Sequence, residues 1–402
     1  MSADPESRHD STSPLAEGSG EYEYPEREID PSTQKAFVPG EGRISGYISA
    51  ILGISSFLGV LCFKYPSWLT TPEFRAAYDL TLLRQLLAAS IWTSLAFGLF
   101  TFLRRQNKRK GATGIAFTLV ALAMGGWEVQ MGELKEAPFT VGVDWLVLSV
   151  LMSFVFVVIE KAWPKYAEQA ITRPAWRLDL LYFTMNTLAV GILLLAGNKF
   201  APAAFGWAIH DGFQSWVQSL PLALQVFLLL FCADFVFYWM HRVFHTVPWL
   251  WRFHAVHHST MHMDWLASSR THFLETLVDR SMVMVPLYLL GTSTEALDIY
   301  AVWIGFQAVF IHANVGIPTG PLKYLLVTPQ FHHWHHSSQD PALDTNYAAT
   351  FPWFDWAFGT YHLPEEHWPA AYGTVTPIPE TFVGHLVHPF VKNELVAEKV
   401  PS

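Results

Sequence analysis

Long uncharged runs of apolar residues recur along the chain from Ile44 onward. A helix needs about 20 apolar residues to cross the roughly 30 Å hydrocarbon core of a bilayer. Six runs approach that length, and each predicts a membrane-spanning helix: 45–63, 85–103, 111–127, 144–159, 180–197 and 219–240. The pattern therefore predicts an all-α fold built as a polytopic membrane helix bundle.

A further pair of apolar runs, 281–290 and 297–313, is shorter in its first limb. Pro286 and Gly291 lie between or near these limbs, and both residues are typical of broken or re-entrant segments. We expect a hairpin that does not cross the membrane fully, with both of its ends on the same side.

The basic residues predict the orientation of the bundle, because short cytoplasmic loops collect Lys and Arg. The loop 104–110, RRQNKRK, is the strongest such signal, and the loop 160–177 on the same side carries four more basic residues, whereas 128–144 is net acidic. We therefore expect a cytoplasmic N-terminus. Six spans then return the chain to the cytoplasm near Met240.

Composition changes along the chain and divides it into four parts. Residues 1–44 hold ten acidic and four basic side chains among Ser, Pro and Gly, which predicts a disordered acidic tail without a secretory signal. We expect an N-terminal transmembrane bundle over 45–200, a catalytic domain over 221–363 and a C-terminal tail over 364–402.

The overall composition excludes several classes of protein. Of the 402 residues, 51% are hydrophobic and 15% charged, whereas soluble chains run near 25% charged. A net charge of −9 without a basic stripe excludes a nucleic-acid partner. Cys62 and Cys232 both lie in apolar runs, which excludes a disulfide scaffold and a CxxC metal site.

Histidine carries the candidate chemistry, since twelve of the eighteen histidines fall between 241 and 336. They form three boxes, HRVFH (241–245), HAVHH (254–258) and HHWHH (332–336). On a helix, positions i, i+3 and i+4 share one face. A tetrahedral site takes at most four protein ligands, so this number of imidazoles predicts two metals. We expect the boxes to form a helical, histidine-rich lobe on the cytoplasmic side.

Some polar residues near the boxes also have candidate roles. Asp234 lies two turns before His241 and is expected to orient imidazole N–H groups. Asn314 and Asn346 either bind ligands or a metal-bound water, or cap helices. Asp355 is expected to tie down the C-terminal lobe through a turn or a salt bridge, with Arg270 as a partner by type.

The remaining histidines are interpreted more simply. His262 and His333 have the wrong phase for their boxes and are expected nearby or on the surface. The isolated His210, His385 and His388 are expected to be satisfied core residues.

At these residues the chain resembles the fatty acid hydroxylase/sterol desaturase superfamily of integral-membrane di-metal enzymes. The segments that carry the resemblance are DFVFYWMHRVFH (234–245), WRFHAVHHS (251–259), SSRTHFLE (268–275), HAN (312–314), QFHHWHH (330–336) and TNYAATFPWFDWAFGTYH (345–362). The resemblance implies these metal ligands, the last less firmly than the others: His241, His245, His254, His257, His258, His312, His332, His335, His336 and His272. It also implies two iron ions, with zinc as an alternative in isolated protein.

The resemblance implies an oxidoreductase that uses O2 to hydroxylate or desaturate a C–H bond of an acyl chain or sterol-like lipid from the bilayer. Electrons are expected from a separate ferredoxin- or cytochrome b5-type donor with its reductase, because the chain has no GxGxxG after a strand, no CxxC and no haem-binding domain. A bacterial inner membrane is favoured over the endoplasmic reticulum, since the C-terminus carries no dilysine or KDEL-type signal.

Three alternatives stay open at this stage. The first is a lipid isomerase or carbon–carbon cleaving enzyme on the same metal frame. The second is a non-catalytic membrane protein that holds structural zinc. The third is a metal transporter or sensor, which predicts ligands along a transmembrane path rather than beyond the ends of the spans.

Overall fold

The computed structural model describes residues 44–70, 79–104, 107–133, 143–364 and 367–391. Over these ranges the regular structure is helical, and the β-type pairings are two isolated bridges, Pro164 with Val315 and Ser337 with Tyr372. The predicted all-α fold is therefore confirmed. Apart from Ile44, the acidic tail predicted over 1–44 lies outside the described residues.

Small side chains bring the helices of an N-terminal bundle close together. A Cβ added at Gly114 would lie 2.2 Å from the hydroxyl oxygen of Ser49. The Ser49 hydroxyl donates to the Ser94 carbonyl at 2.8 Å, and the Thr118 hydroxyl lies 2.8 Å from that of Ser94. Such contacts hold helices together in apolar surroundings. The bundle consists of α1 (Ser45–Lys64), the short α2 (Pro66–Leu69), α4 (Leu80–Leu103) and α5 (Lys108–Ala123).

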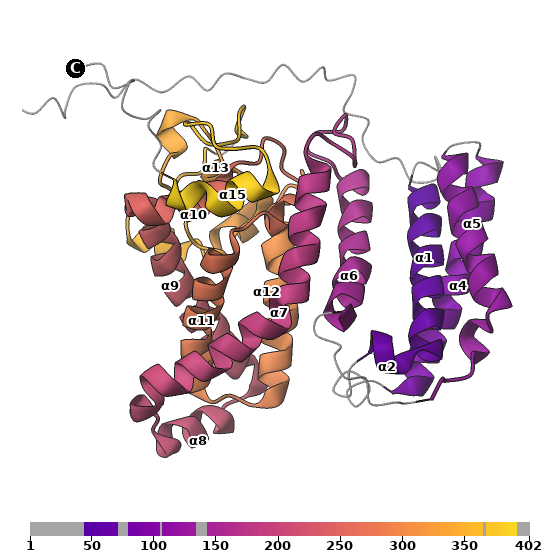
Figure 1. The fold of residues 1–402 in the computed structure, drawn as a ribbon, viewed down its shortest axis with the longest axis horizontal. Coiled ribbons are helices and arrows are strands. Elements are labelled where there is room, and N and C mark those ends of the chain that lie inside the picture. Colours follow the sequence, from indigo (N-terminus) through magenta and orange to yellow (C-terminus); the bar gives the residue numbers. More distant parts are fainter. Residues whose placement is uncertain (1–43, 71–78, 105–106, 134–142, 365–366, 392–402) are drawn as a thin grey trace, which may run out of the picture.

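A second bundle lies beside the first, and its helix α6 faces the first bundle (Figure 1). The short helix α8 (Asp211–Ser219) closes its lower end. Each predicted span in this part of the chain coincides with most of one helix. The bundle contains α6 (Val143–Ala162), α7 (Trp176–Phe205), α9 (Leu222–Thr246), α11 (Phe273–Leu290) and α12 (Thr294–Phe310).

The two apolar limbs of the expected hairpin form α11 and α12, which are joined through Gly291 and both pack against α9. Gly291 follows α11 with a φ of +56°, a left-handed conformation that glycine adopts without strain. The Ser293 side chain caps α12 by accepting the N–H of Ala296. Pro286 lies inside α11, so of the two residues expected to break the helix, only Gly291 does so.

Three of the described helices, α1, α4 and α9, are long and apolar enough to cross a membrane. Large apolar side chains also lie exposed on the bundles, including Trp92 at 60% and Val302 at 73% exposure. Lipid contact accounts for apolar surfaces of this kind. The chain is therefore a membrane protein, and spanning by the other helices stays a prediction.

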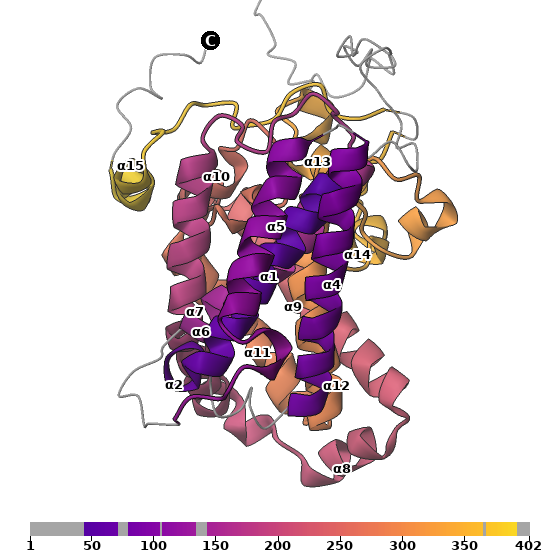
Figure 2. The same cartoon turned by 90° about the vertical axis from the view of Figure 1, so that its right-hand side faces the viewer.

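Short helices and loops form a lobe over the upper ends of α9, α11 and α12, which we call the histidine lobe (residues 241–272, 311–364 and 367–391; Figure 2). Its helices are α10 (Pro248–His258), α13 (Pro329–His335), α14 (Trp353–Ala357) and α15 (Phe382–Val387). Short 3₁₀ turns occur here and between the longer helices: η2 (Gly126–Glu128), η3 (Gly206–Ala208), η4 (Ala267–Ser269), η5 (Gly320–Tyr324), η6 (Asp340–Ala342) and η7 (His388–Phe390).

The end of the chain, expected as a tail, folds back onto this lobe as far as Val391. The ring of Tyr182 in α7 lies 5.0 Å from that of Phe382 in α15. The Tyr182 hydroxyl also lies 3.0 Å from Nδ1 of His385. The ring of Phe390 also lies 5.6 Å from that of Phe253 in α10, so residues 367–391 pack against both α7 and the histidine lobe.

Candidate metal centre

Nine histidines converge in the histidine lobe from segments far apart in the sequence. Two lie in the last turns of α9, three end α10, one follows α12, and three end α13 or follow it directly. Pro248 and Pro329 each occupy the first turn of a short helix, where proline fits best. The Thr328 side chain caps α13 by accepting the N–H of Phe331.

Five of these histidines form one group, which we call group one. Their ligand nitrogens all lie within 4.8 Å of one another. The closest Nε2 pairs are His241 with His254 at 3.0 Å, and His258 with His335 at 3.0 Å. Four of the five residues are buried. His245 is partly exposed, although its side chain is only 4% exposed. Group one consists of His241, His245, His254, His258 and His335.

The other four histidines form group two, again with ligand nitrogens within 4.8 Å of one another. Nε2 of His312 lies 3.1 Å from Nε2 of both His257 and His332. The two groups are neighbours, since the rings of His258 and His336 stack 4.4 Å apart. Group two consists of His257, His312, His332 and His336, all buried.

The second and third boxes divide between the groups. His254 and His258 belong to group one, whereas His257 belongs to group two. In α13, His332 joins group two and His335 joins group one. Imidazoles that share one face of a helix therefore do not all belong to the same group, since the neighbours His257 and His258 lie in different groups.

The tautomers of these imidazoles fit a bound metal ion. Nδ1 of His257 and of His312 lies 3.0 Å and 2.7 Å from the carbonyl oxygens of Arg270 and Ala308. A carbonyl oxygen only accepts, so each Nδ1 carries the proton, and in the neutral ring Nε2 is left with a bare lone pair. These two lone pairs face each other at 3.1 Å. A cation between them would relieve the repulsion.

Group one shows the same arrangement. Nδ1 of His241 and of His335 bonds to the carbonyl oxygens of Tyr347 and Thr345, both at 2.7 Å. Nε2 of His245 is buried and has no hydrogen-bond partner among the described residues. A buried nitrogen without a partner is costly unless a ligand takes it.

Burial also keeps the imidazoles of α10 and of the following segments neutral. Desolvation disfavours the imidazolium ion and lowers the pKa of His254 and His312 well below the ordinary 6.5. The same cause lowers the pKa of His257 to about 4. Since neutral imidazole is the form that ligates metals, the site is prepared for metal at neutral pH.

Glu275 is a site residue that the sequence reasoning missed. Its carboxylate accepts a hydrogen bond from Nδ1 of His254 at 2.5 Å, and its side chain is 3% exposed. Partners of this kind fix the orientation of a metal-ligating imidazole. The signal was present in SSRTHFLE, where Glu275 follows an imidazole by one helical turn.

His272, implied by the resemblance as a ligand, lies outside both groups. Its Nδ1 accepts the N–H of Leu274 at the start of α11, and its Nε2 donates to the carbonyl of Leu386. His262 and His333 also lie outside both groups, as their phase predicted.

Asp234 does not contact an imidazole, contrary to expectation. Its carboxylate accepts the backbone N–H groups of Ala349, Thr350 and Phe351 at 2.7–3.0 Å. It therefore fixes the loop that follows Tyr347, whose carbonyl holds His241. A buried carboxylate on an apolar helix is satisfied here by backbone donors instead of imidazole N–H groups.

The two asparagines act as backbone clamps. Asn314 accepts the N–H of Tyr166 and donates to the carbonyl of that residue. Asn346 donates to the carbonyls of Phe331 and His362 and accepts the N–H of His362. These contacts are neither helix caps nor hydrogen bonds to a grouped imidazole, so they match neither of the two expected roles.

Asp355 stabilises a turn, which is one of the two roles expected for it. It accepts the N–H groups of Tyr347 and Ala348 and the hydroxyl of Thr360. Its expected partner Arg270 instead pairs with Asp179.

The isolated histidines divide as well. His385 and His388 are buried as expected. His210 is exposed and caps α8 by accepting the N–H of Phe213, so the core interpretation was wrong for it.

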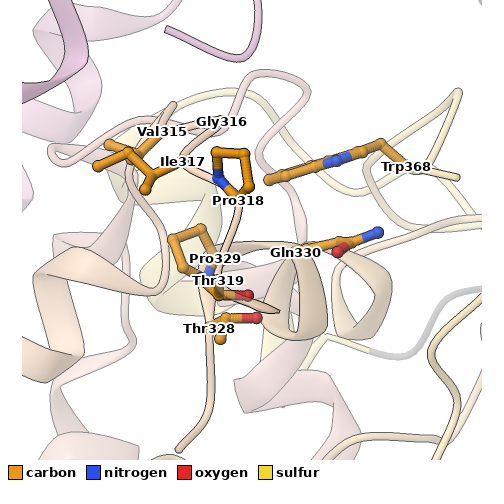
Figure 3. A pocket seen from close by; sticks show the side chains of 9 residues that line it. All are labelled: Val315, Gly316, Ile317, Pro318, Thr319, Thr328, Pro329, Gln330 and Trp368. Atoms are coloured by element: carbon orange, nitrogen blue, oxygen red, sulfur yellow. The ribbon is translucent and has the colours of Figure 1, made fainter. Parts of the chain in front are cut away.

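A small cavity of about 170 Å³ opens beside α13 and the loop after α12 (Figure 3). It is lined mainly by Val315–Thr319, Thr328–Gln330 and Trp368. Since no histidine of either group lines it, this cavity is distinct from the space that the imidazoles enclose.

The sequence model of the fatty acid hydroxylase family matches residues 226–360, and no solved structure matches the chain. The ornithine lipid hydroxylase OlsE of Rhizobium tropici is 32% identical over 252 residues, which is 60% of this chain and 72% of that protein.

Two other kinds of relative match less of their own length. Human alkylglycerol monooxygenase is 32% identical over 36% of this chain and 32% of its own. The very-long-chain aldehyde decarbonylase GL1-5 of Oryza sativa subsp. indica is 26% identical over 59% of this chain and 38% of its own. The chain thus covers less than half of these two proteins.

The likeness to OlsE extends well beyond the histidine boxes, since it takes in nearly three quarters of that protein. The matched family region also contains all nine grouped histidines. The chain therefore belongs to the fatty acid hydroxylase family, and it is an oxidoreductase.

Proposed function

We propose that this protein is a membrane-bound, O2-dependent di-iron enzyme that hydroxylates an unactivated C–H bond of a lipid. The observation that carries the proposal is the pair of adjacent imidazole groups, in which the bare Nε2 lone pairs of His241 and His254 lie 3.0 Å apart and those of His257 and His312 lie 3.1 Å apart. Two cations satisfy those lone pairs, one in each group.

The ligand set is compatible with a redox metal. Group one offers five nitrogens and group two offers four, with no thiolate among the described candidates. Imidazole binds iron well, and zinc is the common competitor. When bound, two irons supply the reduction of O2 that hydrogen abstraction from the lipid requires, with the balance RH + O2 + two electrons + two protons giving ROH + water.

The protein itself holds the imidazoles and excludes water. The carbonyl and carboxylate groups that accept from Nδ1 fix the orientation of the imidazole rings before any metal binds. This lowers the free energy needed to order the ligands when the metal binds. Burial of the ligands keeps the reacting space dry, so reactive oxygen species are directed to the substrate.

A lipid is the proposed substrate because the histidine lobe lies at the end of apolar helices. The hydroxylase and monooxygenase names of two relatives support hydroxylation over desaturation. The aldehyde decarbonylases support a carbon–carbon cleaving reaction as the second candidate.

We further propose a separate ferredoxin- or cytochrome b5-type electron donor with its reductase. A half-buried indole supports a route into group one, since the ring of Trp251 lies 5.0 Å from that of His245 and 5.3 Å from that of His258. Turnover of the purified protein with NAD(P)H alone would contradict a separate donor.

The proposed location is a bacterial inner membrane, crossed several times, with the N-terminus and the histidine lobe in the cytoplasm. The basic loop 104–110 supports this orientation. A relative from Rhizobium tropici supports the bacterial setting.

Lipid analysis of cells that express the wild-type protein, His257→Ala or His335→Ala tests the reaction. We expect a lipid heavier by one oxygen atom with the wild type. Both variants, one from each group, should lose that product together with bound metal, because each removes a ligand. Continued turnover in either variant contradicts the mechanism.

The product itself separates the candidate reactions. A loss of two hydrogens indicates desaturation, and a shortened chain indicates carbon–carbon cleavage. Metal retention without O2 consumption indicates a structural zinc protein.

A further inference from the structure

The segment that joins α10 to α11 has little regular structure of its own, yet it borders the ligands His257 and His258. Residues 259–271 contain only the short turn η4. Their position depends on contacts with residues 160–186, which lie outside the matched family region 226–360. The contacts are Glu160 with Trp265 N–H, Gln169 with the Met263 carbonyl, Arg173 with Asp264, Asn186 with the Ser269 carbonyl, and Asp179 with Arg270.

Asp179 occupies the centre of these contacts. Its side chain, in the first turn of α7, is fully buried and pairs with two arginines. One carboxylate oxygen lies 2.5 Å from Nε of Arg270, and the other lies 2.6 Å from an Nη of Arg173. Arg173 in turn makes two bonds to Asp264 at 2.7 and 2.8 Å. Two acids and two arginines thus balance their charges in the interior.

Arg270 connects this network to a candidate ligand. Its backbone carbonyl accepts the Nδ1–H of His257 at 3.0 Å, and its guanidinium donates to the hydroxyl of Ser259. The guanidinium of Arg270 thus links Asp179 to both ends of the loop 259–270. A shift of Arg270 would release the hydrogen bond that fixes the ring of His257.

We propose that Asp179 is a positioning residue that sets the orientation of His257 through Arg270, and thereby the metal affinity of group two. The segment 160–186 is then a component of the metal centre and not only a membrane anchor. This proposal rests on the proposed function, because it assumes that the protein binds two metals.

The network makes a selective prediction, because its backbone link reaches group two only. Full-length protein in detergent is titrated with Fe²⁺ without O2, and with Zn²⁺, and bound metal is counted by mass spectrometry. We expect Asp179→Asn to weaken one of the two metal equivalents about 10- to 100-fold, the usual effect of losing a supporting partner. The other equivalent should bind as in the wild type.

Ligand-deleted backgrounds identify the affected site. In His254→Ala/His335→Ala protein, which retains group two, Asp179→Asn should weaken the remaining metal. In His257→Ala/His312→Ala protein, which retains group one, it should have no effect. Arg270→Gln keeps the backbone carbonyl but loses the ion pair, so Asp179→Asn should add nothing in that background.

The matched control is Arg84→Gln in the N-terminal bundle. Arg84 donates to the carbonyls of Trp127 and Val129, so this variant also removes an arginine that holds a turn, at a place remote from the histidines. Both metal equivalents should stay unchanged. Arg270→Gln, which loses the ion pair but keeps the backbone carbonyl, replaces Asp179→Asn if that variant does not fold.

Metal binding by the wild type distinguishes a failure of the proposed function from a failure of the positioning role. A wild type that binds fewer than two metals contradicts the proposed function. Two metals in the wild type, with unchanged affinities in Asp179→Asn or Arg270→Gln, overturn only the positioning role. Equal weakening of both metals indicates general destabilisation and also overturns it.

Discussion

Single residues around the imidazoles decide how firmly each candidate ligand is held. Within group one, His254 has a carboxylate partner, whereas His241 and His335 have carbonyl partners. A carboxylate is the stronger acceptor and raises the basicity of the imidazole that it supports. The hydrogen bond from His254 is therefore a sensitive point of group one.

Glu275→Gln tests this point. The amide keeps the size of the side chain and an acceptor oxygen but loses the charge, so we expect the affinity of one metal equivalent to fall about tenfold. The control is Glu295→Gln, an exposed glutamate in the first turn of α12. Unchanged metal affinity in Glu275→Gln would show that the charge of Glu275 is not needed.

At the scale of elements, close backbone approach organises the N-terminal bundle, whereas termini of helices organise the histidine lobe. Gly53 of α1 faces Gly114 of α5 without room for a side chain. In the lobe, α10 and α13 each present imidazoles to both groups, so a small rotation of either helix would disturb both centres.

Gly114→Ala should destabilise the N-terminal bundle by about 1–3 kcal/mol, because the added methyl would overlap Ser49. Gly305→Ala in α12 is the matched control, since nothing lies within 4 Å of a Cβ at that position. Thermal unfolding in detergent measures both variants. Equal melting temperatures would contradict the tight packing of α1 on α5.

At the scale of the whole molecule, folding forces buried imidazoles together, and metal offsets that cost. The pKa of His257, near 4 in the fold and 6.5 ordinarily, is lowered by burial. Such a group binds fewer protons when folded than when unfolded, so acid favours unfolding. Its contribution to stability is present above pH 6.5 and is lost as the pH falls toward 4.

Chelation of the metal should therefore lower the melting temperature at neutral pH, and acid should lower it further in the metal-free protein between pH 6.5 and 4. A metal held at 100 times its dissociation constant stabilises by about 2.7 kcal/mol. Thermal unfolding of metal-loaded and chelated protein across this pH range measures both effects. A pH-independent melting temperature of the chelated protein would contradict the prediction.

Much of this fold was predictable, because apolar periodicity is local. Runs such as 45–63 and 219–240 specified their own helices, and the hairpin followed from two apolar limbs. The partners of single polar residues were not predictable from the same pattern. Asp234 lies on the face of His241, yet it bonds to a loop more than a hundred residues later.

By itself the sequence determined a helical membrane protein with histidines set at helical spacing. Only the tertiary structure decided that His257 and His258 belong to different groups and that His272 lies outside both. It also decided that Glu275 hydrogen-bonds to His254 and that Asp179 pairs with Arg270. The physical reason is that spacing fixes directions on one helix, whereas the identity of a partner depends on how distant helices pack.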